Sequence, residues 1–202
     1  MIDQNILFVH VPKTGGTSIN SVLIKQYNWN IPTSRLSNHQ PIFILEKYNN
    51  LSDYFIFTVV RNPFKRAYSY YHHYQRVSGL RTSFEGFLDM IKTNNKTIDD
   101  MKGLDMIPIK SRTPFISFTQ SFYLYDSSGS MRINKVYKNE NLVELETDFN
   151  ISLPKLNVGS YNTEEYYKAY NQTNIDLVKH IYTEDFVNLG YSTDFKDKHD
   201  DL

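Results

Sequence analysis

The feature that most constrains this chain is an apolar strand that runs directly into a glycine turn and then into a helix. The run from Ile6 to Val11 is β-branched and aromatic, which favours a buried strand over residues 5–11. Apolar residues at helical spacing then predict a helix over residues 17–27. The turn between them reads Pro12-Lys13-Thr14-Gly15-Gly16-Thr17-Ser18. Adjacent glycines let backbone N–H groups approach an anion at the positive end of a helix, so this turn predicts a phosphate-binding loop.

A second strand ends in the same manner. Residues 54–60 are aromatic and β-branched without alternation, which is typical of a strand covered on both faces in a parallel sheet. Asn62 is a good N-cap and Pro63 a good first helical residue, so we expect a helix over residues 63–77. If the two strands are parallel neighbours, Lys13 and Arg61 face a common crevice at one edge of the sheet.

Length and composition favour one α/β domain over residues 1–202. The sequence is 40% hydrophobic and 15% aromatic, enough for a substantial core. We expect a P-loop-like, three-layer domain with a central parallel sheet flanked by helices. The chain has no cysteine, which excludes disulfides, thiolate nucleophiles and cysteine-based zinc sites.

The remaining segments predict further short elements. We expect helices at 41–48, 83–92 and 141–149, a partly helical stretch at 113–125, a turn at 126–130 and a short strand at 135–137. Helical spacing over 161–170 and over 175–189 predicts two closing helices, the second ending at Gly190.

Charge is balanced over the whole chain but uneven along it. Residues 1–84 hold nine lysines and arginines against three aspartates and glutamates, and residues 85–202 hold thirteen against nineteen. The neutral average argues against nucleic-acid binding, whereas the basic first part suits a small polyanionic ligand. Solvated surface charge is the alternative explanation.

The sequence indicates neither a metal site nor a membrane span. His72 and His73 are adjacent on a predicted helix and so point about 100° apart, which disfavours a shared metal. The first apolar run, of about six residues, is too short for a signal peptide or a span. We therefore expect a cytoplasmic protein, and one of the Golgi lumen only if an anchor has been removed. The oligomeric state stays open.

The loop from Pro12 to Ser18 differs from two common phosphate cradles. The nucleotide-triphosphate motif G-x-x-x-x-G-K-[ST] and the dinucleotide motif G-x-G-x-x-G are both absent, and the lysine precedes the glycines. A lysine in this place can reach the bond being broken in transfer from a phosphate-linked donor. An ordinary glycine turn with an incidental lysine is the alternative.

Two motifs together resemble a known family. Val11-Pro12-Lys13-Thr14-Gly15-Gly16-Thr17-Ser18 and Val60-Arg61-Asn62-Pro63-Phe64-Lys65-Arg66-Ala67-Tyr68-Ser69 resemble the cofactor motifs of sulfotransferases that use 3′-phosphoadenosine-5′-phosphosulfate (PAPS). They are most similar to the carbohydrate branch, which includes heparan sulfate 2-O-sulfotransferases and short bacterial relatives. The similarity continues more faintly through residues 137–142, 153–157 and 181–191.

The resemblance implies a role for each motif residue. The loop residues Lys13, Thr14, Gly15, Gly16, Thr17 and Ser18 would hold the 5′-phosphosulfate, and Arg61 with Ser69 would hold the 3′-phosphate. His39, between the motifs, matches the catalytic base, and a neutral imidazole can accept a hydroxyl proton. Lys13 would stabilise charge on the departing phosphate oxygen. His10 falls within the first predicted strand, in the core or behind the site.

The implied reaction moves a sulfuryl group from PAPS to a hydroxyl, on a saccharide by the same resemblance, and needs no metal. Its departure from the family is a late loop, residues 157–161, that is poor in lysine and arginine. Two alternatives remain. A kinase-like phosphoryl transferase would share the strand, loop and helix but requires Mg²⁺ carboxylates. A non-catalytic scaffold would bind a nucleotide or glycan without transfer.

Overall fold

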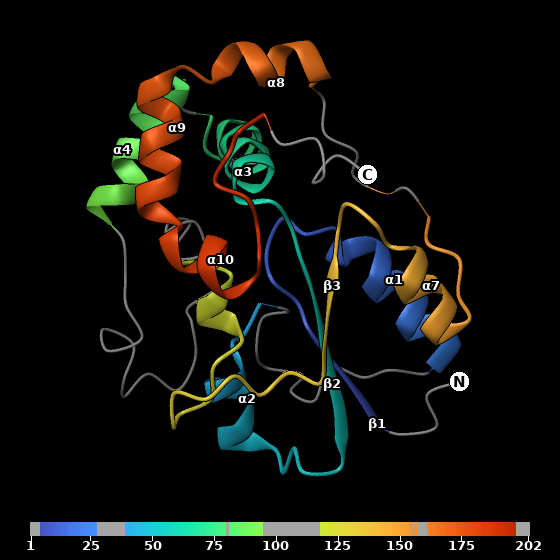
Figure 1. Ribbon diagram of the computed structural model, residues 1–202. Coiled ribbons are helices and arrows are strands. Elements are labelled where there is room, and N and C mark those ends of the chain that lie inside the picture. The colour runs from blue at the N-terminus through green and yellow to red at the C-terminus, as the bar shows by residue number, and fades with distance from the viewer. Residues whose placement is uncertain are drawn as a thin grey trace.

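A three-stranded parallel sheet forms the centre of the fold (Figure 1). The computed structural model describes residues 5–27, 39–79, 81–94, 118–154, 156 and 161–196. The strands are β1 (Asn5–Val9), β2 (Tyr54–Val60) and β3 (Lys135–Lys138), in the spatial order β1-β2-β3. Leu7 pairs with Ile56, and Val60 pairs with Lys138. The carboxyl ends of all three strands therefore meet at one edge, as expected from the sequence.

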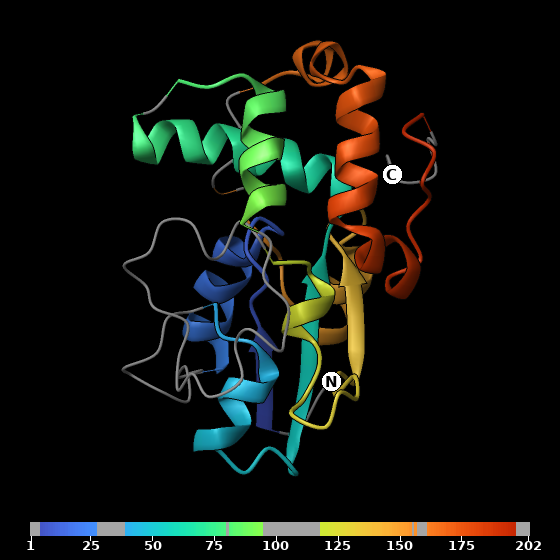
Figure 2. The ribbon, with the colours of Figure 1, turned by 90° about the vertical axis from the view of Figure 1, so that its left-hand side faces the viewer.

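Helices surround the sheet and its carboxyl edge. They are α1 (Gly16–Tyr27), α2 (Ile42–Tyr48), α3 (Pro63–Ser78), α4 (Phe84–Thr93), the 3₁₀ turn η1 (Ser121–Tyr123), α7 (Val143–Phe149), α8 (Thr163–Ala169), α9 (Gln172–Ile181) and α10 (Thr183–Asn188). Figures 1 and 2 show α1 and α7 on one face of the sheet, with α3, α4 and α9 beyond the carboxyl ends of the strands. The expected α/β architecture with a helix-flanked parallel sheet is confirmed.

Successive residues of β1 belong to two separate apolar clusters. Ile6 and Phe8 pack in a cluster that draws its other members from β2, β3, α1 and α7. Leu7 and Val9 belong to the larger cluster, which extends through α2, α3, α4 and α9. Side chains on a strand alternate between the two faces of the sheet, and both faces are covered. This double burial explains the continuous apolar run that predicted the strand.

The start of α3 follows the expected N-cap chemistry. The Asn62 side chain accepts hydrogen bonds from the N–H groups of Phe64 and Lys65, at 2.9 and 3.3 Å. Pro63 occupies the first turn, and Gly79, at φ 70°, ends the helix in the left-handed conformation. The chain thus leaves β2 and enters α3 within two residues, which holds Arg61 at the sheet edge.

The carboxyl end of β1 differs from the sequence prediction. The strand ends at Val9, so that His10 follows it, although both His10 and Val11 remain buried. The cause is a tight turn closed by the Val11 N–H on the Val9 carbonyl at 3.1 Å. Helix α1 correspondingly begins at Gly16, one residue earlier than predicted.

The predicted helix over residues 175–189 is in fact two helices. The break is at Tyr182, which separates α9 from α10 and has φ −112° and ψ 29°. Tyr182 is fully buried and its ring lies 5.5 Å from the guanidinium carbon of Arg66. Periodicity continues across this break because both helices are amphipathic, so local spacing alone could not reveal it. Gly190 has φ 64°, the left-handed conformation expected after the last helix.

Part of the sequence prediction falls outside the described residues. Within 113–125 the structure describes residues 118–125, where only η1 is helical, and the polar stretch from 95 to 117 is not described. No helix in the described ranges is long and apolar enough to cross a membrane.

We expect Asn62→Ala to lower the free energy of unfolding by about 1 kcal/mol, because it removes the side-chain cap of α3. Asn62→Ser should retain most of that stability, since a serine hydroxyl can make the same bonds. Urea denaturation followed by circular dichroism would measure both. Equal losses in the two variants would show that capping is not the cause.

Candidate active site

The loop after β1 has an unusual backbone conformation. Lys13 and Gly15 have φ 70° and 83°, in the left-handed region that residues other than glycine rarely adopt. Such a conformation costs on the order of 1–3 kcal/mol and persists only where the surroundings enforce it. Backbone strain of this kind concentrates at functional sites, which makes this loop a candidate site.

Four consecutive carbonyl groups of this loop accept hydrogen bonds, one from within the loop and three from other parts of the protein. The Thr14 hydroxyl donates to the Val11 carbonyl at 2.8 Å, and Arg66 Nε to the Pro12 carbonyl at 3.1 Å. Arg61 Nη1 donates to the Lys13 carbonyl at 3.4 Å, and Asn139 Nδ2 to the Thr14 carbonyl at 3.1 Å. With these acceptors engaged, the helix start presents N–H groups, the donors an anion requires.

The two glycines of the loop are required by close contacts. A Cβ on Gly16 would lie 2.0 Å from the His10 ring, and a Cβ on Gly15 would lie 2.7 Å from Asn139 Nδ2. Gly15 also needs its left-handed conformation, whereas Gly16 is a glycine for lack of space. Tertiary contacts thus explain both glycines, which sequence reasoning assigned to the approach of a ligand.

His39 lies against the loop in a defined tautomer. Its Nδ1 is 3.0 Å from the His10 carbonyl oxygen, and the two imidazole rings are 4.2 Å apart. A carbonyl only accepts, so Nδ1 of His39 carries the proton and the lone pair of the neutral ring is on Nε2. The amide Nδ2 of Asn20 lies 3.2 Å from His10 Nδ1, and because an amide nitrogen only donates, the proton of neutral His10 is on Nε2.

Burial and neighbouring cations keep His39 neutral. Burial lowers its pKa, the hydrogen bond to the His10 carbonyl opposes that shift, and the charges of Lys13 and Arg66 lower the pKa further. The pKa of His39 is therefore below the ordinary histidine value of about 6.5, and its imidazole is neutral at pH 7. A neutral imidazole with a lone pair on Nε2 is able to accept a proton.

Lys13 is the lysine most perturbed by its surroundings among those described. Burial lowers its pKa to about 8, and the nearby charges of Arg61 and Arg76 contribute. In the part of the chain that the structure describes, no carboxylate lies within ion-pair distance of Lys13, Arg61 or Arg76. Arg61 Nε is moreover buried without a hydrogen-bond partner among the described residues. Such uncompensated cations fit a ligand with several negative charges.

His73 and Arg76 extend the site along α3. Arg76 Nη2 lies 3.3 Å from His73 Nδ1. Burial, followed by the charges of Lys13, Arg76 and His39, lowers the pKa of His73 to about 4. His73 is therefore near enough to Lys13 and His39 for their charges to act on its ring. The sequence analysis considered this residue only as a metal ligand.

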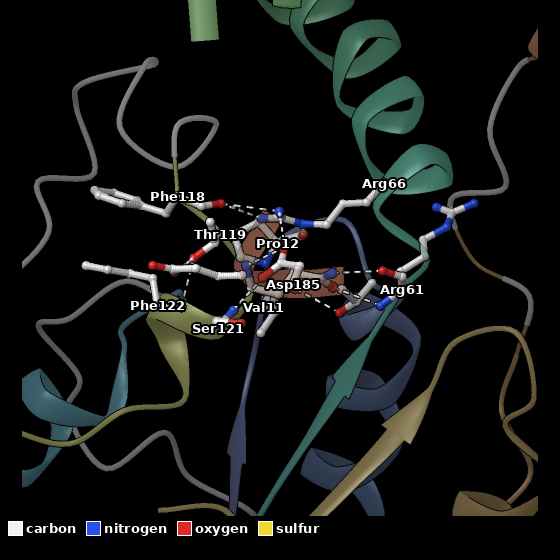
Figure 3. A network of polar contacts seen from close by, with 12 residues as sticks. Val11, Pro12, Arg61, Arg66, Phe118, Thr119, Ser121, Phe122 and Asp185 are labelled. Carbon is white, nitrogen blue, oxygen red and sulfur yellow. Dashed lines mark hydrogen bonds and ion pairs between the residues drawn. The ribbon is translucent and has the colours of Figure 1, made fainter. Parts of the chain in front are cut away.

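A buried polar network lies behind the loop (Figure 3). The fully buried Arg66 guanidinium donates to the Pro12 carbonyl and, through both Nη atoms at 3.2 Å, to the Phe118 carbonyl. Asp185 lies 3.8 Å from Arg66 Nη1 and accepts hydrogen bonds from the N–H groups of Gln120 and Ser121, each at 2.8 Å. Sequence reasoning missed this network, because its members are far apart along the chain.

The structure brings most of the sequence-predicted site residues together at the sheet edge. Lys13 and Arg61 are joined by a hydrogen bond, and His39 is in contact with His10 at the base of the loop. Thr17 is exposed at the start of α1, while the Ser18 hydroxyl is largely buried and accepts from the Leu156 N–H at 3.2 Å.

Ser69 is the predicted site residue that the structure does not join to the loop. It is half-buried on α3, and no hydrogen bond connects it to the loop within the described residues. Residues 157–160 of the late loop are outside those residues. The described ranges contain no group of three His, Asp or Glu side chains suited to a metal ion.

We expect Gly16→Ala to lower the free energy of unfolding by about 1–3 kcal/mol, because the new methyl group collides with the His10 ring. A double-mutant cycle with His10→Ala should show that the two losses are not additive, since the smaller residue at position 10 makes room for the methyl group. Urea denaturation of the four proteins supplies the cycle. Fully additive losses would contradict the contact.

Comparison with known proteins agrees with this geometry. A family model described as the sulfotransferase family matches residues 2–192, nearly the whole chain. No curated protein and no solved structure matches. The match includes both strand-to-helix turns, His39 and the buried network. The chain belongs to the sulfotransferase family and is an enzyme that transfers a sulfuryl group from a sulfonate donor to a hydroxyl-bearing acceptor.

Proposed function

We propose that the sulfuryl donor is PAPS, that the acceptor is a saccharide hydroxyl, and that His39 is the general base. The observation that carries this proposal is the placement of His39, with its lone pair on Nε2, against the loop that holds Lys13. A base and a cation beside one helix N-terminus are what in-line transfer from a phosphate-linked donor requires. We further propose that residues 1–202 form one sulfotransferase domain, in support of which both apolar clusters share one sheet.

The residues present fit a donor with phosphates at two places. Lys13 and the first N–H groups of α1 are suited to the 5′-phosphosulfate, together with the hydroxyls of Thr17 and Ser18. Arg61 offers a buried Nε that has no partner in the described part of the chain, and is suited to the 3′-phosphate. We assign Ser69 to the same phosphate on the strength of the motif. The backbone N–H groups of Gly15 and Gly16 complete the cradle, whereas Thr14 uses its hydroxyl within the loop.

Each group has one role in the proposed step. His39 Nε2 accepts the proton from the acceptor hydroxyl, whose oxygen bonds to sulfur. The bond between sulfur and the 5′-phosphate oxygen breaks, and Lys13 stabilises the negative charge that develops on that oxygen. The products are the sulfate ester and adenosine 3′,5′-bisphosphate.

The saccharide acceptor is supported by the resemblance of both motifs to the carbohydrate branch. Incubation with sulfur-labelled PAPS and a panel of saccharides, lipids and small alcohols tests it directly. Transfer to a saccharide is the expected result, and transfer only to lipids or small alcohols would contradict the assignment. Binding of adenosine 3′,5′-bisphosphate without transfer to any acceptor would instead favour a non-catalytic scaffold.

We expect His39→Ala to lower kcat by about 10²- to 10⁴-fold, because the acceptor proton loses its base. Lys13→Met should lower kcat by about 10²- to 10³-fold through the loss of one stabilising charge. Steady-state transfer assays would measure both, and His180→Ala and Lys25→Met, at exposed positions, are the matched controls. Binding of the bisphosphate should persist in His39→Ala. Near-normal turnover in both site variants would disprove the proposed mechanism.

We expect a bell-shaped pH dependence of kcat/KM for the donor. As pH rises through the lowered pKa of His39, the base becomes neutral and the rate increases. As pH rises past about 8, Lys13 in the free enzyme loses its charge and the rate falls. In Lys13→Arg, which stays charged, the alkaline decline should move to higher pH. An unchanged alkaline limb would show that Lys13 is not the group that titrates.

A further inference from the structure

Gln120 holds the backbone of Arg61 at two points. Its Oε1 accepts from the Arg61 N–H at 2.8 Å, and its Nε2 donates to the Arg61 carbonyl at 2.8 Å. The Gln120 side chain thus continues the hydrogen bonding of the sheet one residue past the end of β2. It is fully buried, so these bonds do not compete with water.

Asp185 in turn holds Gln120. Its two carboxylate oxygens accept from the backbone N–H groups of Gln120 and Ser121, and the side chain is fully buried. Burial raises the pKa of Asp185, while Arg66 and the two N–H groups oppose the rise. Asp185 belongs to α10, which begins after the break at Tyr182, and Figure 3 shows it close to Ser121 and to the Arg66 guanidinium.

The same segment also holds the loop through Arg66. The guanidinium donates hydrogen bonds to the Phe118 carbonyl and to the Pro12 carbonyl. Residues 118–121 are therefore a common support for Arg61 and for the turn that contains Lys13. Both polar side-chain atoms of Gln120 and both carboxylate oxygens of Asp185 are hydrogen-bonded within this network.

We propose that Gln120 and Asp185 are positioning residues, which set the Arg61 guanidinium relative to the Lys13 loop at the separation that the anionic donor requires. The proposal rests on the proposed function, in which both groups bind that donor. Arg61 Nη1 already contacts the Lys13 carbonyl, so a shift of the Arg61 backbone changes the spacing of both cations. A displacement of about 1 Å far from the chemistry can cost on the order of 10²-fold in rate or binding.

The test uses Gln120→Met, which keeps an unbranched side chain of similar size and removes both hydrogen bonds to Arg61. We expect the dissociation constant of adenosine 3′,5′-bisphosphate, measured by calorimetry, to rise about 10- to 100-fold. KM for PAPS should rise in parallel, with kcat at saturating donor within about twofold of the original. Asn134→Ala is the control, because the exposed Asn134 bonds to the backbone of Ile56 near the other end of β2.

A double variant separates positioning from a general loss of structure. In an Arg61→Ala background, Gln120→Met should weaken bisphosphate binding by less than about twofold, because its effect passes through Arg61. Asp185→Asn, which retains one strong acceptor, should weaken binding in the same direction as Gln120→Met and by a smaller factor.

Two results would overturn the proposal. One is that Gln120→Met changes the dissociation constant of the bisphosphate no more than Asn134→Ala does. The other is that Gln120→Met weakens binding as much in the Arg61→Ala background as in the original protein. If Arg61→Ala and Lys13→Met both leave bisphosphate binding unchanged, the proposed donor site itself is wrong, which is a distinguishable outcome.

Discussion

The arrangement of the site depends on one buried cation. Arg66 is fully buried on α3, and its guanidinium bonds to carbonyls on both sides of the sheet edge and faces Asp185. Burial opposes its charge, while Tyr70, Tyr182 and Asp185 outweigh that effect and keep its pKa above the ordinary value. A buried ion pair is weak evidence for stability. Its clearest consequence here is geometric, because one side chain joins the loop, residues 118–121 and α10.

The site combines excess positive charge with imposed conformation. Burial, followed by the charges of Arg61 and Arg76, lowers the pKa of Lys13, and none of these three cations has a carboxylate partner in the described ranges. The positive φ of Lys13 adds backbone strain. The unpaired positive charge and the backbone strain are both present in the folded protein before any ligand binds. An anion therefore binds to a site that is already arranged for it. Burial, together with the charges of Lys13 and Arg66, lowers the pKa of His39, which keeps its imidazole neutral.

Local signals predicted the supporting elements well. Residues 54–60 form a strand as expected, since their apolar run reflects burial on both faces, and α3 begins at Pro63 because Asn62 can cap it. The predicted end of β1 was wrong, because the apolar run continues through His10 to Val11 whereas the strand ends at Val9. The division of residues 175–189 at Tyr182 was also missed, because burial of that ring against Arg66 is a contact between distant segments.

The sequence by itself determined the two strand-to-helix turns and the types of residue that they carry, because these follow from spacing, capping and glycine within a few residues. It placed Lys13, Arg61 and His39 as candidates. Only the tertiary structure decided why Gly16 is a glycine, which nitrogen of His39 carries the proton, and that Gln120 and Asp185 support Arg61. The last two depend on partners 29 to 65 residues apart, His39 with His10 and Asp185 with Gln120. Such pairings arise from packing of the whole chain, and no local pattern encodes them.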